Sequence, residues 1–178
     1  MNDLALKAKI KASSEQECGN AWGIISGQTR SVHGIKGAKL DRIIKGSNRW
    51  MSNPEDGFPV FLELDWEKEI SVEEIQMIFD SGMHRILTLS HSDAYVDKMI
   101  WGKAQPETVK DYKIEGFYKK EKIINLNILD NYQRKNIHRL KEIKKVDRIR
   151  ITILSTNGID HARINEVRIY SSSDRFFY

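Results

Sequence analysis

The chain has 178 residues, of which 40% are hydrophobic and 30% are charged, with a formal net charge of +4. This length favours one domain with its own hydrophobic core, and we predict a single domain over residues 1–178. The only cysteine, Cys18, excludes an internal disulfide framework and a cysteine-rich zinc site. The apolar runs are too short to span a bilayer, so we expect no membrane span.

Apolar residues alternate with lysines near the start of the chain, from Leu4 to Ala12. Alternation with a period of two residues is typical of a strand with one buried face. The pattern predicts an opening strand over residues 4–12.

Strand-like segments rich in alternating or β-branched residues recur along the rest of the chain. They are Val60–Glu67, Tyr112–Gly116, Ile123–Leu129, Arg148–Leu154 and Glu166–Tyr170. Several short strands separated by turns predict an all-β fold, in which two antiparallel sheets form a sandwich. Trp66 alternates with buried positions and is therefore predicted to lie in the core.

The segment Ser71–Phe79 has two interpretations. It begins with a capping box, and Ile75, Ile78 and Phe79 have the spacing of one helix face. Ile75, Met77 and Phe79 also alternate as in a strand. Because the rest of the chain is predicted to be β, we predict a strand here.

Two long segments, residues 13–59 and 81–109, have no regular periodicity. Loops of this length in a compact domain usually carry function or contain short helical turns of their own. Leu40–Ile44 is predicted to form one such turn.

The stretch Lys103–Arg150 holds 14 basic and 7 acidic residues, a local excess of +7. A basic excess is also a feature of proteins that bind nucleic acid or heparin-like polymers. In Lys141–Lys145, however, the lysines are interrupted by Glu142 and Ile143, as on the solvent face of a half-buried sheet. We favour the solvent face, keep anionic-polymer binding as an alternative, and do not expect nucleic acid as a partner.

The common catalytic motifs are absent from the sequence. It contains no G-x-G-x-x-G, P-loop, G-x-S-x-G or H-E-x-x-H motif, and its five histidines are scattered. We therefore predict a chain without catalytic residues, and without bound FAD because the dinucleotide-binding fingerprint is missing.

A series of short motifs, taken in order, resembles the galactose-binding-like, discoidin-type jelly-roll family. These motifs are Ala12–Ser14, Asn48–Ser52, Phe61–Asp65, Ile75–Asp80, Asp111–Glu115, Arg148–Thr152 and Ile164–Tyr170. The resemblance implies a sandwich of about eight antiparallel strands with its ligand sites on loops at one end. It also implies a binding module for glycans, lipid headgroups or partner domains, and a core position for Trp50.

Within this family, Asp130–Arg134 followed by His138 resembles the C-terminal sandwich of bacterial FAD-dependent oxidoreductases. This likeness implies an alternative function as an accessory domain that docks on another domain of a larger enzyme. We interpret Arg134 and His138 as framework residues, with His138 bonded to backbone carbonyls. The first residues lack the layout of a secretory signal, so we expect a cytoplasmic protein or a domain of a longer, exported chain.

The resemblance also raises the question of a structural calcium ion. Family members with calcium often have an Asp-Gly in the first long loop and a glutamate near the final strand. Glu166 matches the glutamate, but Ser26 and Gly27 stand at the Asp-Gly position, so one carboxylate is missing. Calcium affinity depends on carboxylate charge, which weakens the expectation of a calcium ion at Glu166. The alternatives for Glu166 are an ion pair with a nearby arginine or an end cap.

The two long segments combine aromatic side chains with polar ones, as sites that stack sugar rings and bond their hydroxyls do. We predict carbohydrate recognition by both segments at one end of the sandwich. The predicted ligand residues are Trp22, Arg30, His33 and Arg49 in the first segment, and His91, Asp93, Tyr95 and Trp101 in the second.

Overall fold

The computed structural model describes residues 2–29, 48–82 and 102–171. Its elements are η1 (Leu4–Lys7), β1 (Lys9–Ala12), η2 (Ala21–Ile25), β2 (Trp50–Met51), η4 (Pro54–Asp56), β3 (Val60–Phe79), β4 (Val109–Tyr118), β5 (Glu121–Ile128), β6 (Lys135–Thr156) and β7 (Arg163–Tyr170). The η elements are short 3-10 helices. Within these ranges, no helix has the length and apolar character needed to cross a membrane. The turn predicted over Leu40–Ile44 lies outside the described residues.

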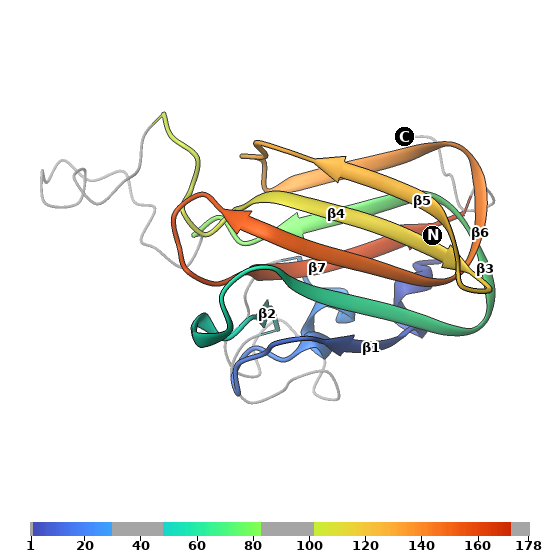
Figure 1. Ribbon diagram of the computed structural model, residues 1–178, viewed down its shortest axis with the longest axis horizontal. Coiled ribbons are helices and arrows are strands. Elements are labelled where there is room, and N and C mark those ends of the chain that lie inside the picture. The colour runs from blue at the N-terminus through green and yellow to red at the C-terminus, as the bar shows by residue number, and fades with distance from the viewer. Residues whose placement is uncertain (1, 30–47, 83–101, 172–178) are drawn as a thin grey trace, which may run out of the picture.

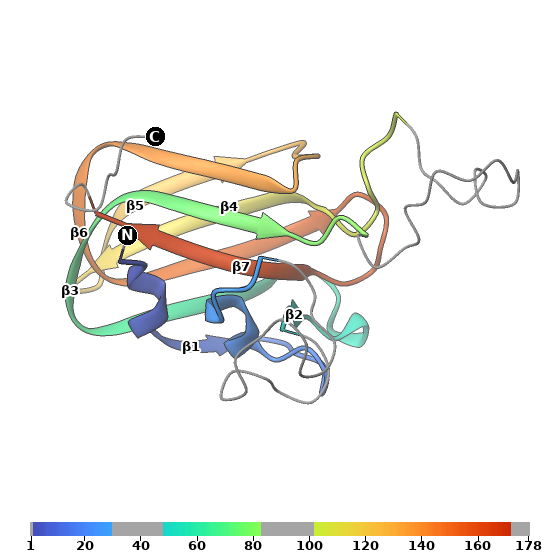
Figure 2. The same ribbon diagram turned by 180° about the vertical axis from the view of Figure 1, so that it is seen from behind.

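The strands form two stacked layers, seen one behind the other in Figures 1 and 2. One layer has the order β5–β4–β6–β3–β1 and uses the second half of β6 with the first half of β3. The other has the order β2–β7–β3–β6 and uses the second half of β3 with the first half of β6. Every pairing is antiparallel, which confirms the predicted antiparallel β-sandwich.

The strands β3 and β6 belong to both layers because each bends between its two halves. Leu62 and Leu64 of β3 pair with Ile151 and Ile149, whereas Ile75 pairs with His138 of the other layer. In Figure 1 both strands curve from one layer to the other at the right-hand end. The opposite end, here called the loop end, comprises residues 52–59, 80–82, 102–108, 129–134 and 157–162.

The core lies between the layers and contains the predicted alternating rows. Leu62, Leu64, Ile75, Met77, Phe79, Ile149, Ile151, Ile153, Val167 and Ile169 are fully buried. The strand prediction for Ser71–Phe79 is thus confirmed, although this segment continues β3 rather than forming a separate strand.

Two tryptophans are part of the core, as predicted. Trp50 is fully buried, and its indole Nε1 donates to the Ser14 carbonyl at 2.9 Å. The Trp66 Nε1 donates to the Leu4 carbonyl at 3.0 Å. Each tryptophan therefore fills core volume while its N–H group is satisfied.

The predicted opening strand is wrong over its first half, because Leu4–Lys7 forms the 3-10 helix η1. The Asp3 carboxylate caps this helix by accepting a hydrogen bond from the Ala5 N–H at 3.0 Å. The small Ala5 is fully buried whereas Leu6 is exposed, so the alternation does not continue through residues 4–7. Only Lys9–Ala12 pairs as a strand, with β3.

Candidate functional site

The loop end is held together by a buried ion pair between Arg49 and Asp80. The Arg49 Nη1 lies 2.7 Å from the Asp80 Oδ2, and Arg163 Nη1 lies 3.6 Å from the same oxygen. Arg49 and Asp80 are 8% and 2% exposed. Burial lowers the pKa of the Arg49 guanidinium, and the negative charge of Asp80 opposes this effect.

Further hydrogen bonds around Asp80 join the flanks of the two long segments. The backbone carbonyl of Asp80 accepts a hydrogen bond from the Thr108 hydroxyl at 3.1 Å. The Asp80 side-chain Oδ1 accepts a hydrogen bond from the Gly82 N–H at 3.0 Å. On the other side, Arg134 donates to the Thr29 carbonyl. Arg49 of the first segment and Thr108 of the second therefore share one buried polar base at the loop end.

Of the eight predicted ligand residues, the structure describes Trp22 and Arg49. Arg49 contributes its guanidinium to the buried base, and a contact of this residue with ligand stays a prediction. The other six residues lie outside the described ranges, and their role also stays a prediction: Arg30, His33, His91, Asp93, Tyr95 and Trp101.

Trp22 belongs to η2 and lines a groove along β1. The groove has a volume of about 800 Å³, and its lining includes Leu6, Ile10, Glu15 and Asn20. The position of η2 is fixed at Gly23, where an added Cβ atom would lie 2.8 Å from the backbone of Asn48. The lining does not include Arg49, so the structure places these two predicted residues in different surroundings.

A second hollow, of about 660 Å³, lies at the loop end itself. It is lined by Gly102, Lys103, Ala104, Gln105, Lys110, Asp130, Tyr132 and Asn157. Sequence reasoning missed this site because Tyr132 stands in an irregular turn with no periodic signal. The available clue was an aromatic residue among turn-forming aspartate and asparagine residues.

The two framework residues of the oxidoreductase-like motif have different partners. The Arg134 guanidinium donates a hydrogen bond to the backbone carbonyl of Thr29. The backbone carbonyl of Arg134 accepts a hydrogen bond from the Phe79 N–H at 2.8 Å. The His138 Nε2 bonds the Tyr112 hydroxyl at 2.9 Å, so the expectation of a backbone partner for this nitrogen is wrong.

Glu166 is fully buried on β7. Its Oε1 accepts a hydrogen bond from the Gly27 N–H at 2.9 Å and lies 3.6 Å from the Arg168 Nε. Its Oε2 is buried without a hydrogen-bond partner. Burial raises the pKa of Glu166 to about 8, and the nearby Arg168 opposes this effect.

These surroundings test the predicted calcium ion. Calcium prefers six to eight oxygen ligands with several negative charges. No group of three or more acidic, histidine or cysteine side chains in residues 2–29, 48–82 and 102–171 is arranged to hold a metal. Arg168 already supplies a positive charge beside Glu166. The described residues thus place an arginine beside Glu166 and do not fit a calcium ion.

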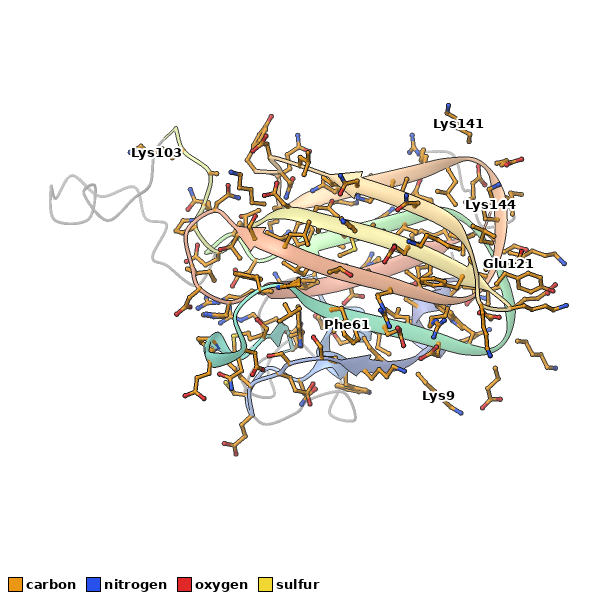
Figure 3. The ribbon with its side chains drawn as sticks, viewed as in Figure 1. Lys9, Phe61, Lys103, Glu121, Lys141 and Lys144 are labelled. Atoms are coloured by element: carbon orange, nitrogen blue, oxygen red, sulfur yellow. The ribbon has the colours of Figure 1, made fainter. Side chains whose placement is uncertain are left out.

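The basic side chains lie at both ends of the sandwich, and several of them form ion pairs. Figure 3 shows Lys103 at the loop end, far from Lys141 and Lys144 at the opposite end. Lys145 pairs with Glu69 at 2.5 Å, and Lys144 pairs with Glu142. This arrangement agrees with a solvent-exposed sheet face rather than one continuous basic patch.

No protein-family model and no curated protein matches the sequence. Solved structures with a similar fold include the family 32 carbohydrate-binding module of NanJ from C. perfringens, in complex with galactose. That comparison has a TM-score of 0.62 and 14% identity, and covers 94% of this chain and 96% of that chain.

Two further structures extend the similarity. The family 32 carbohydrate-binding module of EndoD from Streptococcus pneumoniae gives a TM-score of 0.66 at 14% identity, over 96% of this chain and 100% of that chain. The lectin domain of lectinolysin, complexed with Lewis B antigen, gives a TM-score of 0.65 at 12% identity. That comparison covers 97% of this chain and 98% of that chain. The chain therefore has the galactose-binding-like β-sandwich fold that these modules share.

Proposed function

We propose that this protein is a non-catalytic carbohydrate-binding module that uses the loop end of its sandwich. The observation that carries the proposal is the buried base around Arg49 and Asp80. It brings together the flanks of two segments that both combine aromatic with polar residues. Similar sandwiches have been solved with galactose and with Lewis B antigen, which supports the same class of ligand here.

A glycan array tests this function, followed by calorimetric titration of each glycan bound. We expect the protein to bind a restricted set of glycans. The triple variant Trp22→Ala, Tyr95→Ala and Trp101→Ala should lose most of this binding, because sugar rings stack on aromatic faces. The matched control is Tyr118→Ala, an aromatic substitution at the end of the sandwich opposite the loop end.

The two possible failures have different meanings. An array without any bound glycan would overturn the function. Binding that persists in the triple variant would instead overturn the assignment of the ligand contacts to these three aromatic residues. Unfolding curves of the variant and the control should agree with the wild-type curve before the affinities are compared.

An alternative proposal is an accessory domain of a FAD-dependent oxidoreductase or another larger enzyme. It is supported by the resemblance of Asp130–Arg134 and by the exposure of Leu129 and Tyr132, at 62% and 67%, within or beside that motif. Exposed apolar side chains can contact a partner domain. The test is the native gene: coding sequence for a flavoenzyme or another catalytic domain in the same open reading frame supports this alternative, and the absence of any such sequence eliminates it.

A further inference from the structure

We propose that the hollow beside Tyr132 is a pyranose-binding subsite. The Tyr132 ring stacks on the sugar, and the Asp130–Lys110 pair bonds two neighbouring hydroxyl groups. The inference rests on the proposed carbohydrate-binding function and assigns that function to residues that the sequence did not single out as ligand contacts.

Tyr132 is unusually exposed for an aromatic residue. It is 67% exposed, the highest value among the exposed large hydrophobic residues that the structure describes. It also lines the hollow of about 660 Å³, which is large enough for a sugar ring. An aromatic face that borders such a hollow in a polar setting is suited to stacking on the apolar face of a pyranose.

The turn that presents Tyr132 is held rigidly by its buried neighbour Asn131, which is 6% exposed. The Asn131 N–H donates to the Lys110 carbonyl at 2.9 Å, and its Nδ2 donates to the Val109 carbonyl at 2.7 Å. Its Oδ1 accepts from the Asn136 Nδ2 at 2.9 Å, and its carbonyl accepts from the Asn157 Nδ2 at 2.9 Å. These bonds fix the backbone at Tyr132, so binding costs little ordering of the turn.

Asp130 is fixed on the other side of the same turn. It has a positive φ of 53°, and its N–H donates to the Asp111 Oδ1 at 2.9 Å. The Asp111 Oδ2 in turn accepts from the Ser155 hydroxyl at 2.6 Å. The backbone of Asp130 is therefore anchored, although its side chain is 83% exposed.

The exposed side chain of Asp130 forms a loose ion pair with Lys110, at 3.3 Å between Oδ1 and Nζ. Such an exposed pair contributes little to folding stability, so its polar atoms are available to a ligand. A carboxylate accepts hydrogen bonds and an ammonium donates them. Side by side, they can bond one donating and one accepting hydroxyl of a sugar whose ring lies on Tyr132.

Three variants and one control test the subsite. The probes are D-galactose, D-glucose, D-mannose and L-fucose, titrated at millimolar concentrations with detection by protein NMR. We expect at least one sugar to give saturable shifts, and Tyr132→Ala to weaken its affinity by about tenfold or more. Tyr132→Phe keeps the ring and should recover most of that loss. Asp130→Asn should weaken binding by removing the charged acceptor, while Tyr118→Ala at the other end should match wild type.

Failure of the subsite and failure of the proposed function give different results. If the wild type binds a sugar and Tyr132→Ala binds it equally well, the subsite is overturned while carbohydrate binding stands. If only a larger glycan on the array is bound, the same variants are titrated with that glycan and judged by the same criterion. If the wild type binds neither the four sugars nor any array glycan, both proposals are overturned.

Discussion

Arg49 and Asp80 form an ion pair across the loop end, with 2.7 Å between Nη1 and Oδ2, and both residues are almost completely buried. Arg49 lies in the first long segment, and Asp80 immediately precedes the second. The pair thus connects two parts of the chain that the sequence separates by 30 residues, and it gives both segments a common foundation.

Removal of either partner from this pair should strongly destabilise the protein. Arg49→Met leaves the buried Asp80 with only the more distant Arg163, and Asp80→Asn takes the carboxylate charge away from the buried Arg49. Breaking a buried ion pair in this way typically costs about 3–5 kcal/mol. Urea unfolding at neutral pH measures the loss. The control is Lys9→Met, which removes the exposed pair with Glu67 and should leave the unfolding midpoint unchanged. If Arg49→Met unfolds like wild type but loses glycan binding, Arg49 is a ligand residue rather than part of the framework.

The stability of the protein should depend on pH through Glu166. Burial raises the pKa of this carboxyl to about 8 in the folded state, against an ordinary value of 4.5. The folded state therefore holds the proton more tightly than the unfolded state does. The stabilisation that results is complete below about pH 4.5 and is lost as the pH rises through about 8.

Thermal unfolding across this pH window checks the prediction. Glu166→Gln stays neutral, so the fall in its unfolding midpoint with rising pH should be smaller than in wild type. Glu121→Gln, at an exposed carboxylate of β5, is the control and should follow the wild-type profile. Equal pH profiles for Glu166→Gln and wild type would contradict the prediction.

Calcium should have no effect on this stability. Because Arg168 lies beside Glu166 and the described residues contain no group of three acidic, histidine or cysteine side chains arranged to hold a metal, we expect equal unfolding midpoints in EDTA and in excess calcium chloride. A saturable rise of the midpoint with calcium, lost in Glu166→Gln, would show instead that Glu166 binds the ion.

The hydrogen bond between Tyr112 and His138 should stabilise the contact between the layers. Tyr112 lies on β4 of one layer, and His138 lies on β6 in the other. Burial lowers the pKa of His138, so the neutral imidazole is the form that pairs with the hydroxyl. Tyr112→Phe removes this hydrogen bond between the hydroxyl and the His138 Nε2. We expect the free energy of unfolding, measured in urea, to fall by about 1–2 kcal/mol. Tyr132→Phe, at an exposed ring, is the matched control and should unfold like wild type.

Heparin and DNA should bind only weakly. Several lysines and arginines of the sandwich pair with acidic side chains. Lys11 and Arg150, for example, lie 2.8 and 2.6 Å from the carboxylate oxygens of Glu63. Binding by counterion release requires several cations that face the polymer together. We therefore expect early elution from a heparin column and little change of affinity with salt. A steep fall in DNA or heparin affinity between low and moderate salt would support the anionic-polymer alternative instead.

The sequence predicted the sandwich from its alternating rows, because burial on one face leaves a period of two residues. The rows at Val60–Glu67 and Arg148–Leu154 both lie in strands with buried inner faces. The continuity of β3 was not predictable in the same way, because exposed, charged residues such as Lys68 and Glu69 at its bend resemble a turn. The prediction of the opening strand was wrong around Ala5. The burial of this residue depends on tertiary packing, which the alternation of apolar residues in the sequence does not reveal.

The candidate site was less predictable than the fold. Tyr132 is presented by hydrogen bonds from Asn131 to Val109 and Lys110, more than 20 residues earlier in the chain. The local sequence predicts a turn at this position, but it does not predict which distant residues form hydrogen bonds with the turn. The Arg49–Asp80 pair depends in the same way on the meeting of distant segments.

The sharing of β3 and β6 between both layers has a consequence for how the molecule comes apart. Neither layer can separate from the other, or lose its hydrogen bonds alone, without straightening strands that the second layer also needs. The two layers are therefore expected to melt as one cooperative unit, and hydrogen exchange at the central amides of both should report a common opening reaction.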